Sequence, residues 1–193
     1  MTSATIAIIF GTRPEAIKLA PVYEEMRSRA GLKPLLITTG QHREMLGQVL
    51  DVFDLEPDLS FDIMQHGQSL AQVTSRALVA LEVACDEHEA DLVLVQGDTA
   101  TTFVGALVGY YRQVKVGHVE AGLRSGDKYS PFPEEVFRRL VGGIADLHFA
   151  ATTRARENLL AEGVDAETIF VTGNTVVDAM QSIIERKPTL AGT

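Results

Sequence analysis

Short apolar runs rich in Val, Ile and Leu recur along the chain, and each is followed by a longer stretch with helical spacing of apolar positions. The runs are continuous rather than alternating, which is typical of strands buried on both faces of a parallel sheet. They predict strands over residues 5–10, 35–38, 92–96, 115–119, 147–150 and 169–172, with a shorter strand near 59–63 in an otherwise irregular segment.

The longer stretches predict helices, and Gly, Pro, Ser or Thr stands where most of them begin. The expected helices begin at residue 14, after 40–43 and at 69, 101, 133, 152 or 153, and 173. Strands and helices therefore alternate throughout, which predicts an α/β fold with a mostly parallel sheet, helices on both faces and right-handed crossovers.

Length and composition narrow the class of protein. The 193 residues suit one domain, and an apolar fraction of 46% permits a substantial core. The formal net charge of −9 argues against a dedicated nucleic-acid binder, because such proteins carry a basic excess. No apolar run approaches the ~20 residues of a membrane span, and the N-terminus lacks the basic region of a signal peptide. The single Cys85 excludes an internal disulfide, so we expect a cytoplasmic protein in which Cys85 is an inert core thiol.

Polar side chains follow four of the predicted strands. They are Arg13 and Lys18, then Asp98, then Glu120 with Arg124, Tyr129 and Glu134, and finally Asn174 and Thr175. Because the carboxyl ends of parallel strands meet at one edge of a sheet, we expect these loops to converge on one cleft.

The first of these loops, residues 11–14, has two interpretations. It lacks the glycine spacing of a dinucleotide-binding fingerprint and of a phosphate-binding P-loop. It is either a plain turn between strand and helix or an anion site formed by backbone N–H groups, and Arg13 and Lys18 favour the anion site.

Asp98, Glu120 and Glu134 are the candidate acid and base groups. Moving a proton from one face of a carbon to the other needs such groups on both sides of a substrate. Taken singly, Asp98 could instead cap the following helix, and Glu134 suits a helix N-terminus electrostatically. We expect His118 to be a satisfied core histidine. No His, Cys or Asp cluster has metal-ligand spacing, so we predict no metal.

Six motifs resemble, in order, those of the non-hydrolysing UDP-N-acetylglucosamine 2-epimerases of bacteria. They are residues 10–18, 41–46, 95–99, 117–124, 129–135 and 172–175. The resemblance implies a Rossmann-like domain that is one half of a GT-B fold. It implies interconversion of UDP-GlcNAc and UDP-ManNAc by UDP elimination and re-addition after proton transfer at C2, without a cofactor.

The resemblance also implies roles for single residues. The implied catalytic residues are Asp98, Glu120 and Glu134, and the implied substrate-binding residues are Arg13, Lys18, Asp98 and Glu120. The implied residues of an activator site for a second UDP-GlcNAc are Gln41, His42 and Gln68. The chain departs from the family pattern at Phe137, where members usually have Asn, and at Val141-Gly142-Gly143, where some members have Thr-Gly-His.

Length is the largest departure from the family. We expect residues 1–186 to be the N-terminal domain and residues 187–193 to begin a linker or tail, with the C-terminal domain absent. We therefore expect little or no epimerase activity from the chain alone, homodimers in the full-length form, and a C-terminal half supplied in trans as one possibility. The alternatives are a nucleotide-sugar-binding or regulatory module without catalysis, and half of a glycosyltransferase.

Overall fold

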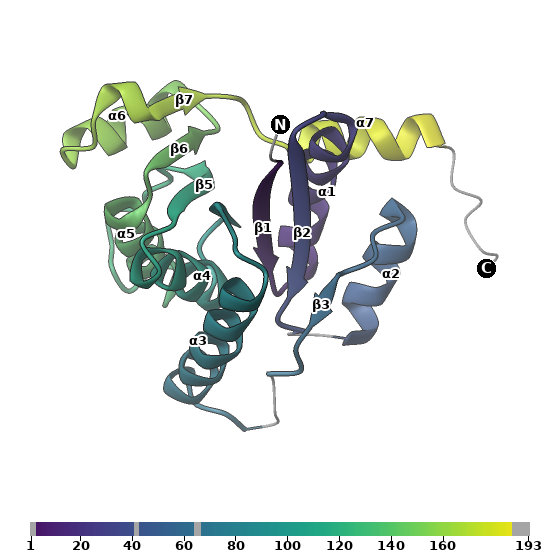
Figure 1. Cartoon of the computed structure of the whole chain (residues 1–193). Coiled ribbons are helices and arrows are strands. Elements are labelled where there is room, and N and C mark those ends of the chain that lie inside the picture. Colours follow the sequence, from purple (N-terminus) through teal and green to yellow (C-terminus); the bar gives the residue numbers. More distant parts are fainter. Residues whose placement is uncertain (1–2, 41–42, 64–66, 187–193) are drawn as a thin grey trace.

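A computed structural model describes residues 3–40, 43–63 and 67–186 (Figure 1). Within them, seven strands form one sheet in the order β3-β2-β1-β4-β5-β6-β7, and all neighbours pair in parallel. The strands are β1 (Ala4–Phe10), β2 (Leu32–Thr38), β3 (Leu59–Ser60), β4 (Leu92–Gln96), β5 (Lys115–Ala121), β6 (Leu147–Ala150) and β7 (Ile169–Val171). The helices are α1 (Arg13–Ser28), α2 (Arg43–Phe53), α3 (Leu70–Glu87), α4 (Ala100–Tyr111), α5 (Glu134–Ile144), α6 (Thr153–Ala161) and α7 (Val176–Arg186), with a 3-10 turn at Ala166–Thr168.

The sequence prediction of alternating strands and helices is confirmed, and the limits of β4 and β6 are those predicted. β2 begins three residues earlier than predicted and contains Pro34. This proline is tolerated because β3 pairs only with Ile37 and Thr38, so no partner strand on that side needs an N–H from residue 34. β5 continues past the predicted end at Val119 and reaches Ala121.

Two apolar layers enclose the sheet. On one face, buried side chains of α3, α4 and α5, among them Leu81, Val104 and Val141, pack on Ile9 and Val95. On the other face, buried side chains of α1, α2 and α7 pack on a second set of strand residues, which includes Ile8, Phe10, Leu36, Leu94 and Val119. Burial of this apolar surface supplies most of the stabilisation of such a fold. It also holds the strand ends rigidly at one edge.

The strand order reverses direction between β1 and β4. From β1 the chain moves outward to β2, and it later returns to β4 on the other side of β1. The loops that follow β1 and β4 therefore separate to opposite faces and leave a crevice between them. Open α/β sheets bind ligands at such a topological switch point.

Candidate functional site

A cavity of about 320 Å³ opens at this switch point. Its lining comes from the loops after β1 and β4, from the first turns of α1 and from the end of β5. The lining residues are Thr12, Pro14, Glu15, Lys18, Gln96, Gly97, Asp98, Thr99 and Glu120. The predicted convergence of polar groups at one sheet edge is thus observed for Lys18, Asp98 and Glu120.

Glu120 is the carboxylate with donors from three different elements. Lys18 of α1 and Gln96 of β4 each donate to Oε2 at 2.5 Å, and Asn174 donates to Oε1 at 2.7 Å. The Glu120 side chain is only 11% exposed. Donors that converge from the helix, the sheet and the loop before α7 fix the orientation of this carboxylate at the cavity wall.

The backbone at Glu120 is in an unusual conformation. Its φ is +63°, in the left-handed region that costs a residue with a side chain of the order of 1–3 kcal/mol. The strand register with β6 also shifts between Val119 and Ala121, as in a β-bulge. Bulges next to functional sites redirect a side chain out of the regular alternation. Here the irregularity turns the Glu120 carboxylate toward Lys18 and Gln96.

The Glu15 carboxylate occupies the position where the sequence suggested that the loop at residues 11–14 could bind an anion. Its Oε2 accepts the backbone N–H groups of Gly11 at 2.8 Å and Thr12 at 2.7 Å, and its Oε1 accepts the hydroxyls of Thr99 at 2.5 Å and Thr102 at 3.0 Å. The interpretation of these N–H groups as a free anion site is therefore wrong, because an internal carboxylate already fills them.

The signal for Glu15 was present in the sequence. The Thr-x-x-Glu spacing of Thr12 and Glu15 is that of a capping box, and in the structure the Glu15 carboxylate accepts the N–H of Thr12 as this motif requires. Because Glu15 also binds the Thr99 side chain, it ties the loop after β1 to the loop after β4. The two walls of the cavity are joined at their base.

Asp98 forms an ion pair with Arg138 of α5, and it does not cap the next helix. The cap of α4 is Thr99, whose hydroxyl accepts the N–H of Thr102. Arg138 is only 12% exposed and also donates to Glu135 at 3.2 Å. Asp98, Arg138 and Glu135 therefore form one chain of charges that leads from the cavity into α5.

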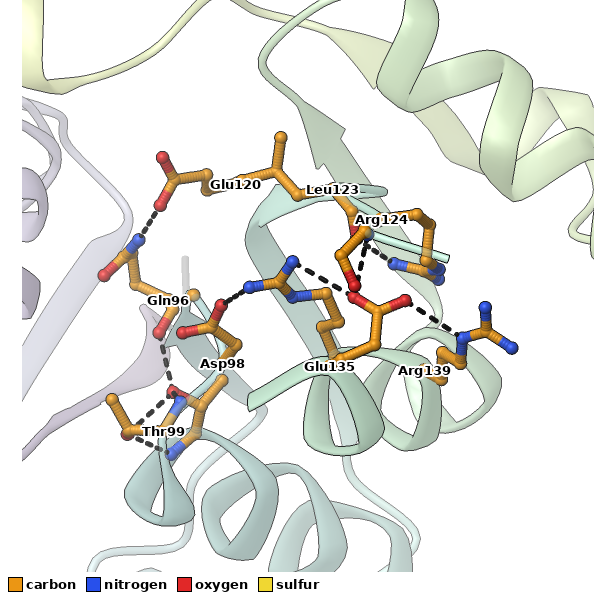
Figure 2. A network of polar contacts seen from close by, with 12 residues as sticks. Gln96, Asp98, Thr99, Glu120, Leu123, Arg124, Glu135 and Arg139 are labelled. Atoms are coloured by element: carbon orange, nitrogen blue, oxygen red, sulfur yellow. Dashed lines mark hydrogen bonds and ion pairs between the residues drawn. The ribbon is translucent and has the colours of Figure 1, made fainter. Parts of the chain in front are cut away.

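Glu135 is fully buried and accepts four donors, whereas the sequence directed attention to its neighbour Glu134. Its carboxylate accepts the backbone N–H groups of Ser125 at 3.0 Å and Gly126 at 3.4 Å, and the side chains of Arg138 and Arg139 (Figure 2). Burial by itself raises the pKa of the Glu135 carboxyl, but these donors outweigh burial and hold the pKa below its ordinary value.

The loop after β5 is fixed from a second side by α6. Arg124 donates to the Glu162 carboxylate through Nε at 2.8 Å and Nη2 at 2.6 Å, and Asn158 donates to the Gly122 carbonyl at 2.9 Å. The hydrogen bond from Arg124 holds the pKa of the Glu162 carboxyl below its usual range. The loop is thus held between α5 and α6.

Substitution of Gly122 tests how closely this loop approaches α6. Its φ is +85°, and an added Cβ would lie 2.2 Å from the carbonyl oxygen of Ala155. We expect Gly122→Ala to lower the free energy of unfolding by about 3 kcal/mol. Gly126 has nearly the same φ, +86°, with no atom within 4 Å of an added Cβ, so Gly126→Ala should cost about 1 kcal/mol. Equal losses in urea titrations of the two variants would contradict the close approach.

His118 is a core histidine, as the sequence predicted, but it is satisfied at one ring nitrogen only, because its buried Nδ1 has no hydrogen-bond partner among the described residues. It is fully buried in β5, and its Nε2 lies 2.7 Å from the Gly97 carbonyl oxygen, which places the proton of the neutral ring on Nε2. Burial lowers the pKa of His118 to about 4 against the opposing effect of this hydrogen bond. The charges of Arg124 and Arg138 act in the same direction as burial, as does His148.

This shift makes the stability of the chain depend on pH. The folded-state pKa of about 4 lies below the ordinary value of 6.5, so the unfolded chain binds the proton first as the pH falls. We expect about 3 kcal/mol of unfolding free energy to be lost between pH 6.5 and pH 4 through this group. Urea titrations at half-unit intervals measure the loss. His118→Gln should flatten the slope in this window, and an unchanged slope would show that another group is responsible.

Arg13, Glu134 and Gln68 are not part of the cavity lining. Arg13 is exposed, and Glu134 is half-buried as the first residue of α5; neither makes a hydrogen bond or ion pair to the part of the chain that the structure describes. Gln41 and His42 lie outside the described residues. Gln68 donates to the Ile63 carbonyl at 3.1 Å in the segment before α3.

The departures from the family pattern have structural roles in this chain. The Phe137 ring stacks on Phe103 of α4, with centroids 5.3 Å apart and planes 7° apart, so it joins α4 to α5. Val141 is fully buried in the core, and an added Cβ at Gly142 would lie 3.2 Å from the Arg124 guanidinium.

Burial raises the pKa of the Cys85 thiol to about 11, which agrees with the prediction of an inert thiol.

In the described ranges, no group of three or more His, Cys, Asp or Glu side chains could hold a metal ion. Among the same residues, no helix has the length and apolar character of a membrane span.

Solved structures define the class of fold. The chain superposes with a TM-score of 0.92 and 44% identity on UDP-GlcNAc 2-epimerase from Neisseria meningitidis bound to UDP-GlcNAc. The aligned region covers 96% of this chain and 50% of the Neisseria chain. For the Methanocaldococcus jannaschii UDP-GlcNAc 2-epimerase in complex with UDP-GlcNAc and UDP, the TM-score is 0.89 at 36% identity. The aligned region covers 96% of this chain and 51% of that chain. A glycosyltransferase from Rickettsia africae shares the fold alone, with a TM-score of 0.56 at 15% identity. The chain is a Rossmann-like α/β domain that corresponds to one half of a GT-B chain, as predicted.

Sequence comparison identifies the family. A family model described as UDP-N-acetylglucosamine 2-epimerase matches residues 24–191. The chain is 51% identical over 184 residues to the UDP-N-acetylglucosamine 2-epimerase of Bacillus subtilis. The aligned region covers 95% of this chain and 48% of the relative. For the UDP-N-acetylglucosamine 2-epimerase of Yersinia pestis the identity is 49% over 181 residues, and the aligned region covers 94% of this chain and 48% of that relative. The chain belongs to the UDP-N-acetylglucosamine 2-epimerase family, and it spans about half the length of the relatives it matches.

Proposed function

We propose that the chain is the N-terminal domain, residues 1–186, of a UDP-GlcNAc 2-epimerase, and that it forms one wall of the active site. The observation that carries this proposal is the convergence of Lys18, Asp98 and Glu120 on the cavity at the switch point. In the proposed reaction UDP leaves from C1 as a proton is removed from C2, and the proton returns to the other face before UDP adds back. No cofactor takes part.

The wall offers acid and base groups with different surroundings. Glu120 is held by Lys18, Gln96 and Asn174, whereas Asp98 is paired with Arg138. A carboxylate that is oriented in advance loses little free energy when it approaches a reacting proton. We assign the proton transfers to Asp98, Glu120 and Glu134.

We assign substrate binding to Arg13, Lys18, Asp98 and Glu120. Because Glu15 fills the N–H groups of the first loop, a diphosphate would be contacted here by the exposed Arg13 side chain rather than by the backbone. We also propose an activator site for a second UDP-GlcNAc at Gln41, His42 and Gln68. The full-length protein would work as a cytoplasmic homodimer.

Measurements of UDP-GlcNAc turnover, by the chain alone and with an added C-terminal half, test the proposed function. The chain alone should turn over little or no UDP-GlcNAc, and addition of the half of the Bacillus subtilis relative that this chain does not match should restore epimerisation. We call this mixture the complemented assay. Turnover by the chain alone at a rate near that of full-length relatives would contradict the assignment of an incomplete site.

Calorimetry with UDP-GlcNAc distinguishes the epimerase half from the main alternative, a nucleotide-sugar-binding or regulatory module. Saturable micromolar binding by the chain without turnover in either assay would favour a nucleotide-sugar-binding or regulatory module. Restored turnover in the complemented assay, together with binding no tighter than millimolar for the chain alone, would support the epimerase half.

A further inference from the structure

Asn174, in the loop between β7 and α7, uses both ends of its side-chain amide. Its Oδ1 accepts the backbone N–H of Val176, the first residue of α7, at 3.0 Å. Its Nδ2 donates to Oε1 of Glu120 at 2.7 Å. The partners fix which end is oxygen, because an N–H group needs an acceptor and a carboxylate needs a donor. One side chain therefore holds both the start of α7 and the Glu120 carboxylate.

The two oxygens of Glu120 are held from different directions. Lys18 and Gln96 both donate to Oε2, whereas in the described part of the chain Oε1 has Asn174 as its donor. Without Asn174, the carboxylate would stay attached through one oxygen and its plane could turn about the terminal bond. A small rotation of this kind misdirects the lone pairs of a base.

Helix α7 is packed on one side and exposed on the other. Ala179 is fully buried in the core that α7 shares with α1. Val177, Met180 and Ile184 face outward and are 54%, 59% and 69% exposed. A shift of α7 on its apolar support would carry Asn174 with it, because the Asn174 side chain accepts the N–H of Val176 at the start of the helix.

We propose that Asn174 is a positioning residue that aims the Glu120 carboxylate and couples the position of α7 to it. The positioning part rests on the proposed function of Glu120, and the coupling part does not. Among charged side chains, Lys18 contacts Glu120 directly from α1, and Glu15 and Asp98 line the same cavity. Asp178 of α7 lies in the turn next to Asn174.

A double-mutant cycle on the chain itself tests the coupling. Asn174→Asp keeps the cap acceptor, loses the donor and sets a second carboxylate against Glu120. Asn174→Ser also keeps a cap acceptor but is too short to reach Glu120. At pH 7 the Asp variant should unfold about 3 °C below the Ser variant, because two ionised carboxylates repel each other.

In the Glu120→Gln background the Asn174→Asp variant should no longer unfold below the Asn174→Ser variant, because no like charge remains and the glutamine amide can donate to the aspartate. Equal unfolding midpoints for Asn174→Asp and Asn174→Ser at all pH values would overturn the coupling, since Asp caps a helix at least as well as Ser. A lower unfolding midpoint of Asn174→Asp that persists in the Glu120→Gln background would overturn it as well.

The positioning role is tested in the complemented assay. Asn174→Ser should lower turnover about tenfold with KM for UDP-GlcNAc unchanged. Asp165→Ala, which removes the cap of the 3-10 turn before β7, at the opposite end of this strand from the loop that carries Asn174, should leave turnover unchanged. Wild-type turnover in Asn174→Ser would overturn the positioning role. If the wild-type mixture has no turnover, the proposed function fails, and the double-mutant cycle still decides the coupling.

Discussion

Glu135→Leu should lower the free energy of unfolding by about 4 kcal/mol, the range expected when one partner of a buried ion pair is removed. The substitution leaves the largely buried Arg138 guanidinium without this partner, and the N–H groups of Ser125 and Gly126 without an acceptor. Urea denaturation at pH 7 measures the loss.

The adjacent carboxylate provides the control for this prediction. Glu134→Leu at the first residue of α5 removes a side chain that has no hydrogen bond or ion pair to the described residues, so only the helix-dipole contribution of up to about 1 kcal/mol should be lost. Similar losses for Glu134→Leu and Glu135→Leu would contradict the network. Because the pKa of Glu135 is depressed, its contribution to stability is present above pH 4.5 and is lost as the pH falls below that value. This loss begins at a lower pH than the loss predicted for His118, which begins at pH 6.5.

Glu120→Gln should reduce epimerisation in the complemented assay by about 10²- to 10⁴-fold, the usual contribution of a general acid or base. The amide keeps the shape of the side chain but cannot accept a proton in the reaction. Thermal unfolding of the variant checks that the domain still folds.

Glu25→Gln is the matched control for Glu120→Gln. It neutralises an exposed α1 carboxylate that pairs with Arg29 outside the cavity, and turnover should not change. Turnover of Glu120→Gln within threefold of the wild type would remove Glu120 from the proton transfers, whatever its place in the structure.

The fold could be predicted from the sequence because its strands are buried on both faces. Residues 92–96 form a continuous apolar run, and β4 has these limits. Ser69 precedes a long amphipathic stretch, and its hydroxyl caps α3 as the pattern indicates. The shortest strand, β3, pairs through two residues only and gave the weakest signal.

The site could be predicted only in part, because tertiary contacts decide which charges are buried. Glu134 and Glu135 are equivalent as sequence signals at a helix N-terminus. Only the position of the loop at 125–126 makes Glu135 the buried one. Likewise, the left-handed backbone of Glu120 depends on the shifted register with β6, and nothing in the local sequence marks it.

The left-handed conformation of Glu120 sets two contributions to stability against each other at one position. Glycine would adopt a φ of +63° without strain. Glycine would also leave Lys18, Gln96 and Asn174 without the acceptor that the Glu120 carboxylate supplies. The hydrogen bonds of the side chain therefore compensate for the strain of its own backbone, so residue 120 is not a position where glycine is simply the more stable choice.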